Sequence, residues 1–322
     1  MSKVHVIHEN AAWLPPLRDA LDDLGTPYAE WHLDSGYFDF SSPPPAGVFY
    51  NRMSASSHTR GHTHAPEYTA SVLAWLGAHG RRVINDGRAL ELEVSKVKQY
   101  AALGAYGIRV PRTSVAVGKE SVRAAAHDFG APLMLKPNRG GKGAGVQLFH
   151  SLDALDAYLD SDDYDAGPDG TILIQQFIES ADSAIIRCEF VGGKFLYAVR
   201  VDTSQGFELC PADVCQIEDQ VCPVGEVPGP RFKVLDNFNH PNIEKYEAFL
   251  AANGIEVSGI EMIVDGDGVA WTYDVNTNTN YNEDAESQAG VAGTSEAGMR
   301  ALAHFLHKEL AEAVPEIQVA AE

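Results

Sequence analysis

The stretch Leu135 to Gly145, LKPNRGGKGAG, places four glycines and three cationic side chains at the end of the apolar run PLML. Glycine lets backbone N–H groups approach an anion closely, so this composition predicts a phosphate-binding loop. It is not a Walker A motif, because Lys142 is followed by Gly143 instead of Ser or Thr. It is not a dinucleotide fingerprint either, because the following VQLF resembles a strand. We predict a flap joining two strands, with a plain surface hairpin as the alternative.

Other charged residues stand in a fixed order around this loop. Lys136 ends the apolar strand that leads into the loop, and Lys96 lies on a preceding helix. Each lysine alone is typical of a solvated surface, but a strand that is apolar on both faces usually ends on a neutral residue. Glu261 lies in one C-terminal strand, and Asp274 and Asn276 share a face of the next. Their oxygens suit Mg²⁺ that is shared with substrate phosphates. The alternative is that the three polar side chains lie on a solvent-exposed strand face.

A second polar cluster follows an N-terminal strand, in YNRMSASSHTRGHTHAPE. Arg52 stands at the strand end, where α/β sheets bind ligands, so we expect it to bind a substrate anion. The spacing of His58, His62 and His64 resembles a set of zinc ligands, with a flexible polar loop as the alternative.

Three cysteines, Cys210, Cys215 and Cys222, lie close together in the sequence. Their spacing matches no common zinc pattern, which favours ordinary thiols over a metal site. Four cysteines in 322 residues also argue against a disulfide framework.

The net charge of −21 would repel a phosphate backbone, so nucleic acid is excluded as a partner. The N-terminus lacks the pattern of a signal peptide, and no window approaches 18 consecutive apolar residues. We expect a cytoplasmic protein without a membrane partner. The oligomeric state is left open, a homo-oligomer included.

The elements that must position these residues are predicted from periodicity and turn signals. Residues 1–90 alternate strand and helix, which predicts a small α/β layer with a parallel sheet. One helix is expected from about residue 90 to Gly107, within a linking segment 91–112. Residues 113–178 predict a compact α+β unit that carries the glycine loop. Residues 179–322 turn to β structure, with a hairpin at Gly192 and Gly193 and a final helix from about 294 to 313.

These motifs together resemble the ATP-grasp fold, in particular its RimK-like, glutamate ligase-like branch. The resemblance covers residues 91–282 and rests on the helix lysine before GIRVPRT, the Lys-Pro strand end with its flap, the segment ILIQQFIE, and GIEM followed by YDVN. It implies an α/β protein, α+β in its C-terminal part, that holds ATP between two α+β subdomains behind a preceding α/β domain.

The resemblance implies a role for each matching position. Lys96 and Lys136 would contact the nucleotide phosphates, and Arg187 would lie near the transferred phosphoryl group. Gln176, Phe177 and Ile178 would be the adenine hinge, and Glu179 or Asp182 would hold the ribose. Glu261, Asp274 and Asn276 would bind Mg²⁺, with Mn²⁺ as an alternative, and the flap glycines are Gly140, Gly141, Gly143 and Gly145. Arg52 and Arg200 are the candidate substrate-binding cations.

The function implied is an ATP-dependent carboxylate-amine ligase that forms an amide through an acyl phosphate and releases ADP and phosphate. Its substrates would be small molecules or short peptides. Residues 203–222 contain no Lys or Arg, which argues against an acidic peptide. Two alternatives remain: a kinase-like or regulatory protein that binds ATP in the same cleft, and a metal sensor built on the His and Cys clusters.

Overall fold

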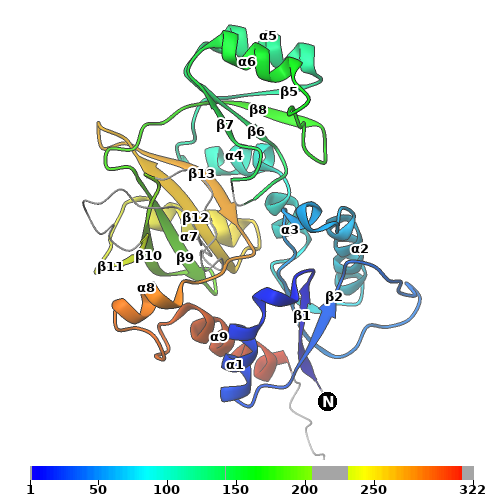
Figure 1. The fold of residues 1–322 in the computed structure, drawn as a ribbon. Helices are drawn as coiled ribbons and strands as arrows, with labels where there is room; N and C mark the ends of the chain where they lie inside the picture. The colour runs from blue at the N-terminus through cyan, green and yellow to red at the C-terminus, as the bar shows by residue number, and fades with distance from the viewer. Residues whose placement is uncertain (1, 142, 205–230, 314–322) are drawn as a thin grey trace, which may run out of the picture.

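The computed structural model describes residues 2–141, 143–204 and 231–313. In these residues the chain forms three sheets with helices packed around them, stacked as an N-terminal layer, a central sheet and a lid (Figure 1). The mixed α/β fold class predicted from the sequence is confirmed by this architecture. The cysteines Cys210, Cys215 and Cys222 lie outside the described residues.

The N-terminal layer is a four-stranded parallel sheet in the order β2-β1-β3-β4. Its strands are β1 (Lys3–His8), β2 (Tyr28–His32), β3 (Gly47–Asn51) and β4 (Arg82–Ile84). Its helices are α1 (Pro15–Asp23) and α2 (Ala65–Ala78), with 3-10 turns at Ala11–Trp13 and Ser57–Arg60. The predicted alternation of strand and helix is confirmed. Because the sheet is parallel, β1 and β3 end at the same edge, which faces the rest of the molecule.

The single helix predicted after residue 90 is wrong, because the chain forms two helices there. They are α3 (Gly87–Glu93) and α4 (Lys96–Ala105). Ser95 between them has extended backbone angles, and its side chain accepts a hydrogen bond from Lys98 N, which caps α4. The Ser95 hydroxyl and Lys96 N also donate hydrogen bonds to Asn138, which directly follows strand β6 (Leu133–Pro137). The apolar pattern predicted one continuous helix, but the cap at Ser95 and the contact with Asn138 divide it into two.

The lid is an antiparallel sheet in the order β5-β8-β6-β7, with two helices on one face. Its elements are β5 (Thr113–Val117), α5 (Lys119–Phe129), β6 (Leu133–Pro137), β7 (Gln147–Phe149), α6 (Leu152–Asp160) and β8 (Thr171–Gln176). β6 and β7 are joined by the glycine loop, so the predicted strand-loop-strand unit is confirmed. Leu133, Leu135 and Ile174 bury one face of this sheet against α5 and α6.

The central sheet is antiparallel and has the order β11-β10-β9-β12-β13. Its elements are β9 (Ala184–Val191), β10 (Lys194–Asp202), β11 (Phe232–Leu235), α7 (Asn242–Ala252), β12 (Val257–Val264) and β13 (Ala270–Asn276). The predicted β9–β10 hairpin is confirmed. Strand β11 and helix α8 (Glu283–Gln288) were not predicted, the latter because it lies in a polar stretch.

The last described helix, α9 (Gly298–Ala313), packs on the N-terminal layer. Leu302, Leu306 and Leu310 share a buried cluster with residues of α1, β1 and β3. Figure 1 shows α9 beside α1 at the base of the molecule. No helix in the described part of the chain has the length and apolarity needed to cross a membrane.

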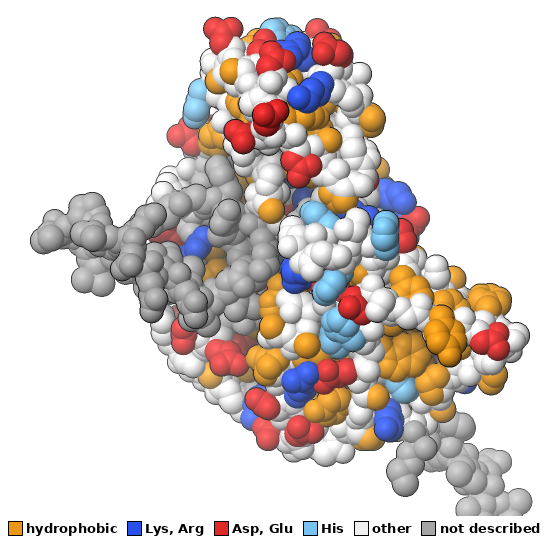
Figure 2. All heavy atoms as spheres, turned by 45° about the vertical axis from the view of Figure 1, so that its right-hand side comes forward, with side chains coloured by type: hydrophobic (Ala, Val, Ile, Leu, Met, Phe, Trp, Pro, Cys, Tyr) orange, Lys and Arg blue, Asp and Glu red, His pale blue; other side chains and the backbone are white. Residues whose placement is uncertain are grey.

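The surface mixes acidic and basic side chains on the face in Figure 2, and hydrophobic side chains gather on the protruding part of the N-terminal layer. The connection between β2 and β3 contributes two strongly exposed aromatic residues, Tyr37 and Phe40.

Candidate functional site

The three layers meet around one cavity of about 400 Å³. Its walls come from α4, β6 with the glycine loop, the segment after β8, and strands β9, β12 and β13. The N-terminal layer contributes Trp13, Ser54 and Ser56. The cavity is therefore built from segments that lie far apart in the sequence and that the sheets bring together.

Most of the residues singled out in the sequence line this cavity. They are Lys96, Lys136, Gly140, Gly141, Gly143, Gln176, Phe177, Ile178, Glu179, Arg187, Glu261, Asp274 and Asn276. Gly145, Asp182, Arg52 and Arg200 do not line it. Arg200 on β10 instead donates hydrogen bonds to the Asp182 side chain and carbonyl, at 3.0 Å each.

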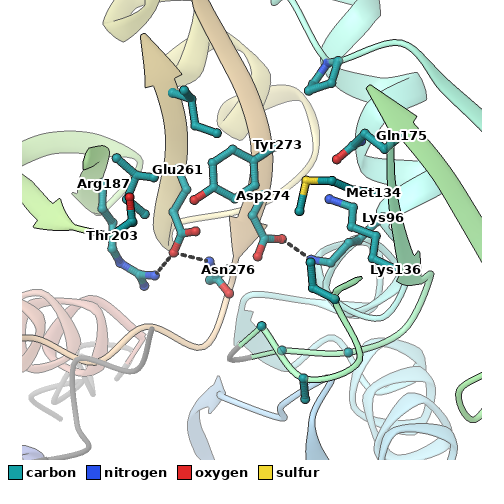
Figure 3. A pocket seen from close by; sticks show the side chains of 18 of the residues that line it. Lys96, Met134, Lys136, Gln175, Arg187, Thr203, Glu261, Tyr273, Asp274 and Asn276 are labelled. Carbon is teal, nitrogen blue, oxygen red and sulfur yellow. Dashed lines mark hydrogen bonds and ion pairs between the residues drawn. The ribbon is translucent and has the colours of Figure 1, made fainter. Parts of the chain in front are cut away.

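The oxygen-rich trio is positioned by pairing of neighbouring strands. Glu261 on β12 lies directly opposite Asp274 on β13. Asn276 lies two residues after Asp274 and therefore points to the same face. Figure 3 shows the three side chains on one side of the cavity, opposite Lys96 and Lys136. The two strands are close neighbours, as the sequence-based metal hypothesis requires.

Lys96 and Lys136 differ in their partners. Lys96 Nζ contacts Asp274 Oδ1 at 2.5 Å. Lys136 is 5% exposed, and among the described residues it forms no ion pair; its ammonium lies over the rings of Tyr100 and Tyr273, 5.3 and 5.7 Å from their centroids. Burial, with a smaller contribution from nearby Lys96, lowers the pKa of Lys136 to about 7. The cavity thus contains a buried amine that an anion would stabilise in its charged form.

Arg187 is held on the same face of the central sheet by Glu261 and by two residues that were not singled out in the sequence, Glu189 and Thr279. Its Nε donates to Glu189 Oε1 and its Nη1 to Glu261 Oε1, both at 2.6 Å, and its Nη2 donates to Thr279 Oγ1 at 2.7 Å. Burial opposes the charged form of Arg187, but the two carboxylates outweigh it and raise the pKa of the guanidinium. Glu189 is 2% exposed, and alternation along β9 places it on the face of Arg187, which is the signal that could have found it.

Gly259 is a third residue that was not singled out in the sequence. It lies opposite Glu189 on β12, and a Cβ atom added there would collide with the Arg187 guanidinium. The glycine in SGIEM therefore makes the space in which Arg187 lies.

A fourth such residue is Glu93 at the end of α3, which is 8% exposed and lines the cavity. Its carboxylate accepts hydrogen bonds from the backbone of Ala55 and from the backbone and hydroxyl of Thr277. Burial raises the pKa of Glu93 despite these donors. It ties the N-terminal layer to the segment after β13.

The glycine loop lies against the N-terminal layer. Arg139 Nη1 donates to Glu67 Oε1 on α2 at 2.6 Å, and a Cβ atom at Gly141 would lie 3.3 Å from Ser56 Cβ. The base of the loop is fixed by Asn138, whose amide donates to Asp169 at 2.6 Å. Gly143 and Gly145 have φ values of 77° and 74°, which glycine adopts without strain.

The three histidines with metal-like spacing do not converge. His62 Nδ1 lies 2.9 Å from Glu9 Oε2, His58 Nδ1 lies 3.1 Å from the Ala55 carbonyl, and His64 directly precedes α2. Within residues 2–141, 143–204 and 231–313, no group of three or more His, Cys, Asp or Glu side chains is arranged to hold a metal ion. The trio Glu261, Asp274 and Asn276 includes only two such side chains, and its oxygens fit an ion that also takes phosphate oxygens as ligands.

Comparison with known proteins gives the arrangement a family context. Residues 94–208 match the RimK-like ATP-grasp domain. The chain is 29% identical over 140 residues to a probable alpha-L-glutamate ligase of Vibrio vulnificus, a match that covers 43% of this chain and 46% of that protein. It resembles a counterpart from Teredinibacter turnerae to the same extent. The match therefore spans less than half the length of these relatives.

Solved structures match over nearly the whole chain. A RimK domain ATP-grasp protein from Sphaerobacter thermophilus superposes with a TM-score of 0.64 and 19% identity, covering 94% of this chain and 99% of that one. The D-cycloserine synthetase DcsG gives 0.63 and 17%, covering 95% and 99%. The ATP-grasp ligase PsnB complexed with a minimal precursor gives 0.63 and 15%, covering 96% and 99%. The chain has the ATP-grasp fold, and its resemblance to RimK-like ATP-grasp proteins is confirmed over residues 94–208.

Proposed function

We propose that this protein is an ATP-dependent carboxylate-amine ligase. The observation that carries the proposal is the arrangement in the cavity, where Lys96 and Lys136 lie on one side and Glu261, Asp274 and Asn276 on the other, with Lys96 in contact with Asp274 and the glycine loop in the cavity wall (Figure 3). Cations on one side and hard oxygen ligands on the other suit a nucleoside triphosphate with its metal ion. The names of the relatives, ligases of the ATP-grasp type, support the same reaction class.

In this proposal each predicted residue keeps its role. Lys96 and Lys136 bind phosphate oxygens, and the loop glycines cover them. Gln176, Phe177 and Ile178 pair with the adenine, and the position of Glu179 in the cavity wall favours it over Asp182 as the ribose ligand. Arg52 serves the substrate; Arg200 would reach a substrate only after leaving Asp182.

Glu261, Asp274 and Asn276 would hold Mg²⁺, or Mn²⁺, together with phosphate oxygens. In this structure Asp274 is paired with Lys96, and Glu261 with Arg187, so each carboxylate already has a compensating cation. Two carboxylates and an amide are too few ligands to surround a metal ion by themselves. They suit an ion that also takes phosphate oxygens as ligands. When bound, the ion would neutralise the charge on the phosphate oxygens.

The chain's own residues account for the rest of the chemistry. A carboxylate oxygen of the acid substrate attacks the γ-phosphorus, the bond to the β-phosphate oxygen breaks, and ADP leaves. The amine nitrogen then attacks the acyl carbon, the C–N bond forms, phosphate leaves, and the amine gives up a proton. Lys136 and Arg187 stabilise the negative charge, and the glycine loop excludes water that would hydrolyse the acyl phosphate.

The test is whether ADP release requires two substrates. We expect a screen of amino acids and dipeptides, as paired acid and amine, to find release that depends on both and is accompanied by an amide product in mass spectra. ADP release with a phosphorylated product and no need for an amine would support a kinase-like protein instead. ATP binding without turnover under any pairing would support a regulatory role.

A further inference from the structure

Arg52 is a buried cation whose position suits ligand binding. It directly follows β3, at the carboxyl edge of the parallel sheet, where α/β sheets bind ligands. It is 2% exposed. Its Nε donates to Asn278 Oδ1 at 3.2 Å and its Nη2 to Asn280 Oδ1 at 2.8 Å. Both asparagines line the cavity, so a single layer of amide side chains separates Arg52 from it.

No carboxylate of the described residues is paired with Arg52. Among the described residues it forms no ion pair, and its Nη1 is buried without a hydrogen-bond partner. Arg187, which is also buried and lines the cavity, is bonded to two carboxylates. Burying a guanidinium costs free energy unless an anion compensates it, so an unpaired buried arginine calls for a ligand or a structural explanation.

The groups around Arg52 do not provide that compensation. The hydroxyls of Tyr50 and Tyr281 are close enough to affect its charge, and both are buried without a partner. His8 at the end of β1 is 2% exposed, and neither of its ring nitrogens has a hydrogen-bond partner. Burial, together with nearby His32, lowers the pKa of His8 to about 4 although Glu30 opposes this, so its ring is neutral at pH 7. Tyr50, Tyr281 and His8 therefore do not neutralise the charge of Arg52.

We propose that Arg52 forms a subsite for a substrate carboxylate that does not react. The proposal rests on the ligase function above, since the reacting carboxylate must lie at the lysines and the trio. Asn278 and Asn280 follow Asn276 by two and four residues, so the subsite lies within about 14 Å of that metal-ligand candidate along the chain. Because Nη1 is closed off from solvent, the carboxylate would displace one of the two amides, exchanging a neutral hydrogen bond for a charge-assisted one.

Two sources could supply this carboxylate, and the experiment separates them. It could be the free carboxylate of the amine substrate, as in an amino acid, or a second carboxylate on the acid substrate. With the best pair from the ADP-release screen, the amine substrate is replaced by its C-terminal amide, and in a second arm the acid is replaced by its monocarboxylate analogue. In the arm that removes the carboxylate bound by Arg52, we expect kcat/KM of the wild type to fall about 10- to 100-fold. This fall corresponds to the free energy of one charge-assisted hydrogen bond.

The variant Arg52→Gln should remove the preference for the substrate that carries this carboxylate, so that kcat/KM for the two forms of the substrate differs by no more than about threefold. Arg52→Lys should retain part of the preference. Arg18→Gln is the matched control, because Arg18 lies in the same layer and pairs with Glu30 at the surface. It should keep the full preference. A preference that survives in Arg52→Gln, or a wild type with no preference in either arm, would overturn the subsite.

One further measurement covers the two remaining outcomes. If Arg52→Gln fails to fold, thermal unfolding of wild type and Arg52→Lys is followed with sodium succinate against sodium chloride at equal ionic strength. A succinate-specific rise in the wild type that is smaller in Arg52→Lys supports the subsite, and equal curves overturn it. If no pair releases ADP, the ligase function fails, and the same succinate titration still decides whether Arg52 binds a carboxylate.

Discussion

Nucleotide binding should draw a proton into the cavity at Lys136. In the free protein, burial lowers the pKa of this amine to about 7. Phosphate oxygens beside it would favour the charged form and raise that pKa toward its ordinary value of 10.5. A full return would correspond to about 5 kcal/mol of differential interaction, which is an upper limit for this one contact.

The number of protons taken up follows from these values. At pH 8 only about a tenth of the free protein carries a proton on Lys136, so binding should take up about 0.9 protons. At pH 7 the uptake should fall to about 0.5. Since the bound state holds more protons than the free state, affinity should decrease as pH rises above 7.

The assay is calorimetric titration of ADP with Mg²⁺ at pH 8 in Tris and in HEPES. ADP lacks the γ-phosphoryl group that the proposed reaction transfers, so it binds without turnover. Its phosphates have lost their protons at pH 8 and do not contribute to the proton uptake. The dependence of the observed enthalpy on the ionisation enthalpy of the buffer gives the number of protons taken up.

Two variants identify the amine responsible. Lys136→Arg keeps a cation that stays charged throughout this range, so ADP should bind without the proton uptake. Lys96→Arg is the matched control, because Lys96 is already paired with Asp274, and it should retain the uptake. A wild type that takes up no proton at pH 8, or an equal uptake in Lys136→Arg, would refute the reasoning.

Three other changes test separate parts of the site. Asp274→Asn should reduce kcat at saturating Mg²⁺ by at least about 100-fold while ADP binding changes little, and near-normal ADP release would remove the metal assignment. Gly259→Ala should lower the free energy of unfolding by about 1–3 kcal/mol, because the added methyl group collides with a guanidinium. Gly266→Ala, which meets nothing within 4 Å, should leave chemical denaturation curves unchanged. Arg139→Ala should speed hydrogen exchange across the glycine loop, because its contact with Glu67 is lost, and unchanged exchange would mean that this contact does not hold the loop.

Elements with their own local pattern could be predicted from the sequence. The strand ending at Lys136 and the hairpin of β9 and β10 depend on apolar runs and turn glycines that lie side by side in the chain. The break before α4 could not be predicted, because it depends on Asn138, more than 40 residues away.

The same distinction applies to the site. Lys96, Arg187 and Asp274 could be singled out because charged residues stand within recognisable motifs. Glu189 was missed although its alternation with Arg187 along β9 was a signal, because its role depends on contact with the Arg187 side chain, and the space for that side chain depends on the glycine across the sheet. The neutral surroundings of Arg52 are likewise a property of packing, which no local pattern contains.

The docking of α9 on the N-terminal sheet affects how the protein must fold. The cluster that contains Val4, Leu17 and Val48 is completed by Leu302 and Leu306, nearly 300 residues later. During synthesis, the N-terminal layer therefore emerges with part of its apolar surface uncovered, and it can complete this cluster only after α9 has left the ribosome. Contacts of such high sequence separation slow folding, and the exposed surface in the interim favours association with chaperones. The N-terminal layer is thus made well before α9, the helix that completes its core.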